Sequence, residues 1–375
     1  MVSTTTAGLT TSYAYNNAGQ MQTITQPGSR VISYSYSPDG RIARITDSLG
    51  NAISYSYDSE GRRIEEDVND PQNALTRYAG YGYDNYGHLN MVTLPGSAQE
   101  TSEYDLVGNL IKTVNATSMQ TGYQYDALRR LLSVTEAGTV TAGYTYDAHG
   151  NVTRVTDAKN NATSFTYDDF GRKVSGTAPD TGLTGYSYDA AGNLVSATDA
   201  KGQATGFTYD ALNRPVSQSY AGAGSNVLFT YDQGSNAIGH LSRIQNPEGT
   251  VSFAYDNKGR IATETRVIGT TSHTINYSWD AATGDLAGMI YPSGLSLAYA
   301  RDASGQVTSI NMNGTPLVSA ASHLPFGPFK GAALGSVSLT REYDQRYNVT
   351  RITAGGFDYA YTRDAGGFVP NSGVF

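Results

Sequence analysis

The stretch NLVSATDAKGQATGFTYDALN, residues 193–213, contains one full copy of the pattern that runs through this chain. Two short segments that favour strands, 193–198 and 203–209, are each followed by a turn that begins with an aspartate, at Asp199 and Asp210. Aromatic and β-branched residues favour strands, whereas Asp, Asn and Gly favour tight turns. The stretch therefore predicts two strands and two turns, which make one unit of an antiparallel β-meander.

The same pattern recurs along almost the entire chain, anchored on the residue after the last aromatic, as in YSYDSEG, YTYDAHG and YSYDAAG. The regular anchors from residue 105 onward are spaced by 21 residues: Asp105, Asp126, Asp147, Asp168, Asp189 and Asp210. The other anchors are Asn16, Ser37, Asp58, Asp84, Asp232, Asp256, Asp280, Asp302, Asp344 and Asp364. Because self-similarity at a fixed period indicates stacked supersecondary units, we expect one array of about sixteen repeats over residues 1–375. Within it, residues 313–340 are expected to form an irregular Pro/Gly segment.

Each position of the repeat has a physical interpretation. The anchor Asp should accept a hydrogen bond from the backbone two residues later. The Gly three residues after it, as in Gly61 and Gly192, can adopt a positive φ, and Asn213 replaces it in one copy. The Tyr-x-Tyr spacing places both rings on one side of the sheet, so we expect cross-strand aromatic ladders. Aliphatic residues three apart, such as Ile42 and Ile45, break strict alternation and predict a β-bulge or strong twist.

These features together predict an all-β fold with no helix longer than about two turns. The tandem hairpins should form a long, curved antiparallel sheet, a partial β-cocoon or solenoid-like shell, because a long twisted sheet does not stay flat. Strands at the ends of such a sheet carry unpaired backbone groups. We therefore expect self-association near residues 13–15 or 357–361, unless the polar segment MVSTTTAGLT folds over the first edge.

The composition excludes several classes of function. The chain has 25 basic and 33 acidic residues, a net charge of -8 and no basic cluster, which disfavours nucleic acid and anionic membranes as partners. It has no cysteine, which excludes disulfides, thiolate metal sites and thiol catalysis. No apolar run approaches ~18 residues, so no membrane span is expected. The first residues lack the basic and apolar regions of a secretory signal peptide.

No catalytic, cofactor-binding or metal-binding residue is predicted, and we expect neither an enzyme nor a cofactor. The histidines show no metal-ligand spacing: they are His88, His149, His240, His273 and His323. His88 and His149 follow the Asp of a turn closely and should face solvent. The repeated aspartates lack the Gly-Gly-x-Gly-x-Asp pattern of calcium-binding repeats, so they are interpreted as turn caps.

Two pairs of adjacent carboxylates, Glu65-Glu66 and Asp168-Asp169, could suggest a glycosidase dyad. Adjacent side chains on a strand point to opposite faces, so solvated pairs in loops or turns are the preferred interpretation. The chain also lacks a Gly-x-Ser-x-Gly elbow, a phosphate-binding loop and a dinucleotide fingerprint.

The segments YSYDSEGRR, YTYDAHGNV, FTYDDFGRK and YSYDAAGNL resemble the YD repeats of the Rhs proteins, of the B and C components of insecticidal toxin complexes, and of animal teneurins. The likeness covers nearly the whole chain. HLPFGPFKGAALG (323–335) followed by REYDQRYNVTRI (341–352) resembles the proline-glycine segment late in bacterial Rhs cores. In that family the repeats wind into a hollow cocoon that encloses a toxic C-terminal domain until delivery.

The chain departs from the family pattern in its C-terminal part. Family cores end in a self-cleavage segment with the pattern Asp, two residues, Gly, three residues, then Asp-Pro-x-Gly. The only Asp-Pro here is Asp70-Pro71, which Gln72 and Asn73 follow, and the chain stops at GGFVPNSGVF. The resemblance therefore implies a truncated or excised piece of shell wall, without protease or toxin activity.

The resemblance also implies partners and a location. The partners are an enclosed toxin cargo or the remaining shell segments of the parent protein, which is exported or displayed at the cell surface. A carbohydrate-binding or cell-surface adhesion module is the alternative, because Tyr-rich surfaces can stack on sugars. Regular aromatic spacing in every repeat favours the structural role, since a binding site would use a few special positions.

Overall fold

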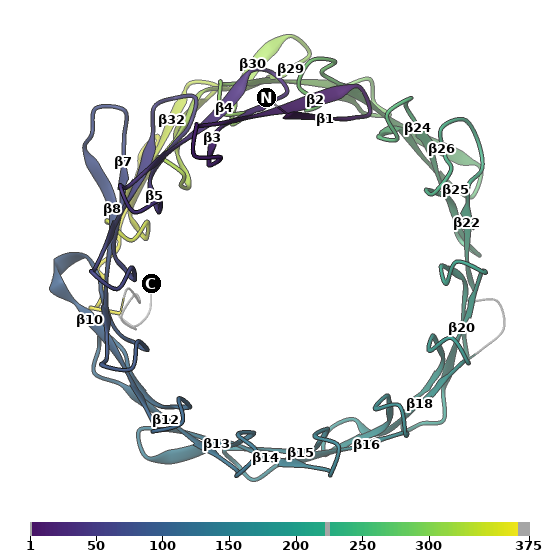
Figure 1. Ribbon diagram of the computed structural model, residues 1–375. Helices are drawn as coiled ribbons and strands as arrows, with labels where there is room; N and C mark the ends of the chain where they lie inside the picture. The colour runs from purple at the N-terminus through teal and green to yellow at the C-terminus, as the bar shows by residue number, and fades with distance from the viewer. Residues whose placement is uncertain (1, 222–225, 367–375) are drawn as a thin grey trace. The chain divides into compact units, whose positions relative to one another are not determined.

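A computed structural model describes residues 2–221 and 226–366 of the chain. Within these ranges it has 34 β-strands and one short 3-10 helix, η1 (Pro95–Ser97), so the predicted all-β fold is confirmed (Figure 1). Contacts divide the chain into two compact units. Unit 1 comprises Met1–Ser102, Val114–Ser118 and Asn276–Phe375, and unit 2 comprises Glu103–Thr113 and Met119–Ile275.

Unit 1 contains two runs of hairpins. The first run is β1 (Val2–Thr6), β2 (Leu9–Tyr15), β3 (Met21–Gln26), β4 (Arg30–Tyr36), β5 (Ile42–Thr46), β6 (Ala52–Tyr57), β7 (Arg63–Asn69), β8 (Leu75–Tyr83) and β9 (Leu89–Thr93). The second run is β27 (Leu286–Ile290), β28 (Ser296–Arg301), β29 (Val307–Met312), β30 (Thr315–His323), β31 (Phe329–Leu334), β32 (Val337–Tyr343), β33 (Val349–Ala354) and β34 (Phe357–Ala360).

Unit 2 contains one run of hairpins between two boundary regions. Its strands are β12 (Gln120–Tyr125), β13 (Leu131–Glu136), β14 (Thr139–Tyr146), β15 (Val152–Asp157), β16 (Ala162–Tyr167), β17 (Lys173–Ala178), β18 (Gly182–Tyr188), β19 (Leu194–Thr198), β20 (Ala204–Tyr209), β21 (Pro215–Tyr220), β22 (Val227–Tyr231), β23 (Leu241–Asn246), β24 (Gly249–Tyr255) and β25 (Ile261–Ile268). Three strands contain a boundary between the units: β10 (Gln99–Tyr104), β11 (Leu110–Val114) and β26 (Thr271–Trp279).

Strands pair with their neighbours in the chain, always antiparallel, as a meander requires. Next to the turn that the anchor residue opens, the register of the two paired strands shifts by one residue, as the aliphatic spacing predicted. Tyr146 lies opposite Val152 while Thr145 lies opposite Arg154, so one residue of β15 is unpaired. The same shift places Tyr36 opposite Ile42 and Ser35 opposite Arg44. A β-bulge at this position reconciles the three-residue spacing with the pleat of the sheet.

The sheet has two chemically different faces. Residues directly opposite each other share a face, so Tyr34 lies with Ile45, and Ile45 lies with Ile53. We call this the tyrosine face. The other face is rich in small hydroxyl side chains, and Thr166 Oγ1 and Ser175 Oγ are 2.6 Å apart there. Strict alternation between apolar and hydroxyl residues is expected for strands whose two faces meet different surroundings.

Very little of the chain is fully buried. The accessible surface is 21916 Å², whereas the size scaling for compact monomers gives roughly 14,000 Å² for this mass. The buried apolar residues of the described part are few, namely Ala52, Val68, Ala237, Pro325 and Ala332. Within each unit the strands therefore form a single layer, and side-chain contacts between neighbouring strands replace a conventional core.

Two stretches that depart from the repeat spacing contain hairpins with register shifts. The long interval between Asp58 and Asp84 is absorbed by a lengthened β7–β8 hairpin with a register shift at Val68 and Asn69. Residues 313–340 contain β30, β31 and the start of β32. The register of β30 against β31 shifts between Ser319 and Ser322 and again between Ser322 and His323, and Phe326 in the turn has a positive φ of 46°.

The prediction that the sheet has an open edge at residues 13–15 was wrong. The segment that begins the chain forms β1, and Val2 lies opposite Tyr13 in the β1–β2 pairing. The polar segment therefore covers this edge, which was the alternative. At the other expected edge, β34 pairs with β33 through Ile352 and Tyr359.

Candidate functional site: the aspartate turns and tyrosine rows

Every regular repeat places the anchor Asp at the start of a tight turn. Asp147 Oδ1 accepts hydrogen bonds from the backbone N–H groups of His149 and Asn151, both at 2.9 Å, and Oδ2 accepts one from Asn151 Nδ2 at 2.9 Å. The bond from two residues later was predicted, whereas the two from four residues later were not. The positive φ of Gly150, 91°, closes the turn.

The turn satisfies the carboxylate completely within its own loop. The side-chain amide of Asn151 lowers the pKa of Asp147 below its usual range, and backbone N–H donors add to this effect against desolvation. The same combination, led by an asparagine side chain, lowers the pKa of Asp105 and Asp189. Among the residues that the structure describes, no three His, Asp or Glu side chains gather as a metal site would require.

The residue four positions after the anchor is a functional position that the sequence analysis missed. It is most often an arginine or an asparagine: Arg41, Arg62, Asn109, Arg130, Asn151, Arg172, Asn193, Arg214, Asn236, Arg260 and Asn348. Arg172 Nε donates to Asp168 Oδ2 at 2.7 Å, and its Nη1 donates to the backbone carbonyl of Asp189 in the next repeat at 3.2 Å. Its guanidinium also covers the ring of Tyr188, 4.8 Å from the ring centre. An arginine here therefore joins one turn to the next.

The anchor tyrosine connects the two strands of its own repeat through its hydroxyl. Tyr188 Oη donates to the carbonyl of Lys173 at 2.8 Å, which lies fifteen residues earlier at the start of the preceding strand. Tyr167 and Tyr209 do the same to Val152 and Leu194, both at 2.8 Å. The same bond recurs from Tyr36, Tyr57, Tyr146 and Tyr255. This bond explains why the second aromatic of the repeat is Tyr.

The first aromatic of the repeat makes a different contact. In the described structure the hydroxyl of Tyr186 makes no hydrogen bond, and phenylalanine occupies the same position at Phe165 and Phe207. Lys173 Nζ lies between two successive rings, 5.6 Å from Phe165 and 4.6 Å from Tyr186. The expected ladder of directly stacked rings was therefore wrong here, because a cation separates the rings.

The histidines are scattered through both units. His149 is exposed, as predicted, whereas the prediction for His88 was wrong: it is half-buried and its Nδ1 is 2.9 Å from Asp84 Oδ2. His240 stacks on Tyr255 with ring centres 4.5 Å apart. His323 meets Phe329 edge to face, and His273 is exposed on β26. Each ring has a separate environment within the repeat.

The adjacent carboxylates also have separate structural environments. Glu65 and Glu66 lie on β7 and face opposite sides of the sheet, with Glu66 ion-paired to Arg63 at 2.9 Å and to Arg77. The Glu66 side chain is only 14% exposed, so the interpretation as a solvated pair was wrong for it. Asp168 caps its turn and Asp169 is exposed.

The carboxylate of Asp70, in the only Asp-Pro, caps the β7–β8 turn. Its Oδ1 accepts hydrogen bonds from the N–H groups of Gln72 at 3.0 Å and Ala74 at 2.8 Å. This is the same capping geometry as in the regular repeats.

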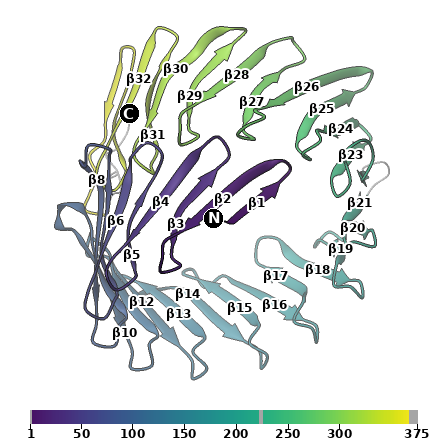
Figure 2. The ribbon, with the colours of Figure 1, turned by 45° about the horizontal axis from the view of Figure 1, so that its top comes forward.

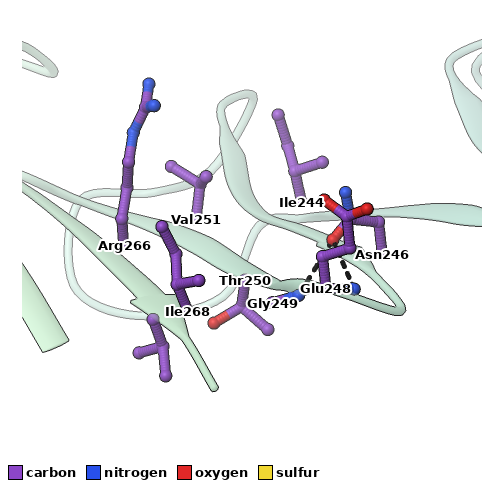
Figure 3. A pocket seen from close by; sticks show the side chains of 9 residues that line it. Ile244, Asn246, Glu248, Gly249, Thr250, Val251, Arg266 and Ile268 are labelled. Carbon is purple, nitrogen blue, oxygen red and sulfur yellow. Dashed lines mark hydrogen bonds between the residues drawn. The ribbon is translucent and has the colours of Figure 1, made fainter. Parts of the chain in front are cut away.

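A pocket of about 260 Å³ lies in unit 2 beside the turn between β23 and β24 (Figure 3). Ile244, Val251 and Ile268 line it, and the Asn246 side chain is used by the turn, accepting from the N–H of Gly249 at 2.9 Å. Arg266 extends away from that turn and is bonded to Glu264 at 2.9 Å. A catalytic or small-molecule site needs several polar groups that converge on the pocket. The polar groups of this pocket do not converge in that way.

A family model described as the teneurin YD-shell matches three overlapping segments of the chain, residues 3–117, 98–234 and 206–327. The chain belongs to the teneurin YD-shell family. A search of the curated proteins found no match to this YD-shell chain.

Solved structures share the fold of this YD-shell chain. The TcdB2-TccC3 complex without its hypervariable C-terminal region matches 95% of the chain at a TM-score of 0.73 and 14% identity. The Tc holotoxin pore of Photorhabdus luminescens matches 96% at 0.66 and 15%. The TcdB2-TccC3-Cdc42 structure matches 94% at 0.57 and 16%. The YD-shell chain spans only 21% or 22% of the length of these solved chains.

The family and the fold agree on a structural role. The YD-shell family model matches most of the chain, and the few buried residues indicate hairpins arranged in a single layer. Both observations are typical of a structural shell protein. The described ranges contain no helix with the length and hydrophobicity that a membrane crossing requires.

Proposed function

We propose that this chain forms part of the wall of a shell that encloses a toxic protein cargo for delivery, and that it performs no catalysis itself. The observation that carries the proposal is the single layer of strands, in which side-chain bonds between neighbouring strands and turns replace a core. Such an architecture produces a large surface from few residues, which suits an enclosure. The partners are the cargo and the other shell segments of the parent protein, which is exported or displayed on the cell surface.

The solved relatives in fold support this proposal. They are TcdB2-TccC3, the same complex without the hypervariable C-terminal region, and a Tc holotoxin pore. The proposal extends to this chain only the general arrangement of a YD-repeat wall around a variable partner.

The alternative role, carbohydrate binding or cell adhesion, has less support. Sugar binding by stacking needs free aromatic faces. In the repeats, Arg130 covers Tyr146 at 4.6 Å and Arg214 covers Tyr231 at 4.4 Å. The anchor hydroxyls are also used by backbone carbonyls. A glycan array tests this alternative directly, and we expect no specific binding.

Protease protection tests the proposed wall. The protein is expressed with its native flanking coding sequence, digested under native conditions, and analysed by mass spectrometry. We expect a fragment from outside residues 1–375 to survive intact, and to become sensitive when guanidinium opens the sheet. Equal sensitivity of every flanking segment under native conditions would contradict enclosure.

A further inference from the structure

Unit 1 contains a seam between its two runs of hairpins. Figure 2 shows the first run, in purple and blue, next to the second, in green and yellow. The described pairings of unit 1 all join consecutive strands of the chain, so no sheet hydrogen bonds cross the seam in the described ranges. Contacts between side chains, with glycines at the points of closest approach, therefore hold the two runs together.

The first contact is ionic. Arg30, at the start of β4, forms an ion pair with Asp285, just before β27, and Arg30 Nη1 is also 3.4 Å from Asp285 Oδ1. These side chains are 17% and 25% exposed, so water screens them only partly. Arg301, at the end of β28, lies 3.9 Å from the same carboxylate.

Glycines make the close approach possible. A Cβ on Gly28 would lie 2.5 Å from Thr283 Cγ2, and one on Gly305 would lie 2.7 Å from Arg30 Cζ. Both glycines have positive φ, which their own turns require. Side chains at either position would push the two runs apart.

The second contact is neutral. Tyr347, between β32 and β33, has its hydroxyl 2.9 Å from Thr76 Oγ1 on β8. The same hydroxyl donates to the carbonyl of Pro325 at 2.7 Å, and Arg77 lies 5.9 Å from the ring centre. Thr76 Oγ1 also lies 2.8 Å from the carbonyl of the fully buried Val68. Two hydroxyl hydrogens serve these three contacts, so the cross-seam bond forms when one hydroxyl donates to the other and the second donates to its carbonyl.

We propose that the Arg30–Asp285 and Thr76–Tyr347 contacts are two clasps of a separable joint, which opens while both runs of hairpins stay folded. The reason is the difference in bonding: each run keeps its backbone hydrogen bonds when the seam parts, and only side-chain contacts are lost. That the two runs can separate is inferred from the bonding alone and does not depend on the proposed function. That a shell wall opens at this seam does rest on the proposed function.

The ionic clasp should remain closed in mildly acidic solution. The hydrogen bond from Arg30 lowers the pKa of Asp285 below its usual range, against desolvation, and Thr283 and Arg301 add to this effect. The other charged groups near Arg30 are Asp280 and Asp302. A carboxylate with a lowered pKa favours the closed seam above its ordinary pKa of about 3.9, and this preference is lost as the pH falls through the lowered value. At pH 5 to 6 the clasp is therefore intact.

Spin labels test the joint in the full chain. The native chain has no cysteine, so Ser35→Cys on β4 and Ala298→Cys on β28, both at exposed positions, give two specific labels. We expect one narrow distance distribution at pH 7 and at pH 5. In the variant that also carries Asp285→Asn and Tyr347→Phe, we expect a broad distribution shifted to longer distances, with unchanged β-sheet circular dichroism. Asp168→Asn is the matched control, because it removes an Asp–Arg pair within a single turn and should leave the distance unchanged.

Two outcomes would overturn the proposal. An unchanged narrow distribution in the double variant would show that the clasps do not hold the seam. Loss of the β-sheet signal together with the distance would show that the seam cannot open separately. If the double variant fails to fold, Asp285→Asn and Thr76→Val are measured singly, and each must broaden the distribution while the sheet signal is retained.

Discussion

The hydroxyl of the anchor tyrosine offers a sharp test of how the strands of each repeat are held together. Tyr167, Tyr188 and Tyr209 each donate to a carbonyl fifteen residues earlier, at 2.8 Å in all three cases. Replacing all three by Phe removes three part-buried hydrogen bonds and keeps every ring in place. A net value of about 1 kcal/mol for each bond predicts a loss of about 3 kcal/mol if the sites act independently.

We expect the three tyrosine sites to contribute independently to stability, because equivalent positions in successive repeats are two strands apart, about 10 Å. The matched control is Tyr123, Tyr144 and Tyr186 changed to Phe, which removes three hydroxyls that make no hydrogen bond in the described structure. We expect the control to change stability by less than about 0.5 kcal/mol.

Hydrogen exchange with mass spectrometry is the appropriate assay, because tandem repeats open locally and exchange reports the protection of each strand separately. In the anchor triple variant the protection of strands β16–β21 should fall by about fivefold where one hairpin opens alone, as about 1 kcal/mol implies, and by about a hundredfold where these strands open together, as about 3 kcal/mol implies. The control triple variant should retain its protection. Equal effects of the two triple variants would refute the assignment of a bonding role to the anchor hydroxyl.

Three further predictions follow from the turns, the buried core and the charges. Gly192 has a φ of 91°, so Gly192→Ala should destabilise its hairpin by about 1 kcal/mol or more while Gly192→Asn costs less, as thermal melting of the two variants will show. Val68→Ala should cost about 2 to 3 kcal/mol in urea unfolding because Val68 is fully buried, whereas Val140→Ala, at a residue 51% exposed, should cost less than about 1 kcal/mol. Asp105, Asp147 and Asp189 have pKa values lowered chiefly by asparagine side chains, so their contribution to stability is complete above pH about 4 and is lost as the pH falls further. Unfolding midpoints measured from pH 7 to pH 2 should be flat at first and then decline, and a decline already at pH 6 would argue against this origin.

Much of the fold could be predicted from the sequence because its determinants are local. The Asp that opens each turn, the Gly or Asn three residues later and the Tyr-x-Tyr spacing act within a single hairpin. Asn213, for example, has the positive φ of 59° that its place in the turn predicted. The bulge was also predictable, because the aliphatic spacing conflicts with the alternation of a strand.

The contacts between repeats were not predictable in the same way. Direct stacking of tyrosines was a reasonable expectation from spacing, but Lys173 occupies the space between the rings of Phe165 and Tyr186. The preference for Arg or Asn four residues after the anchor was visible in the sequence, although its meaning depends on the position of the next repeat. The seam joins Arg30 to Asp285 across 255 residues, and no local pattern encodes such a distance.

An experimental density map that resolves side chains in the full chain is the most direct test of the central claim, that side-chain bonds between neighbouring strands and turns hold a single layer of strands together. The account predicts density that connects the hydroxyls of Tyr167, Tyr188 and Tyr209 to the carbonyls of Val152, Lys173 and Leu194. It also predicts the Arg172 guanidinium over the ring of Tyr188. Anchor hydroxyls that point into solvent, or anchor rings packed directly on one another without the arginine between them, would contradict it.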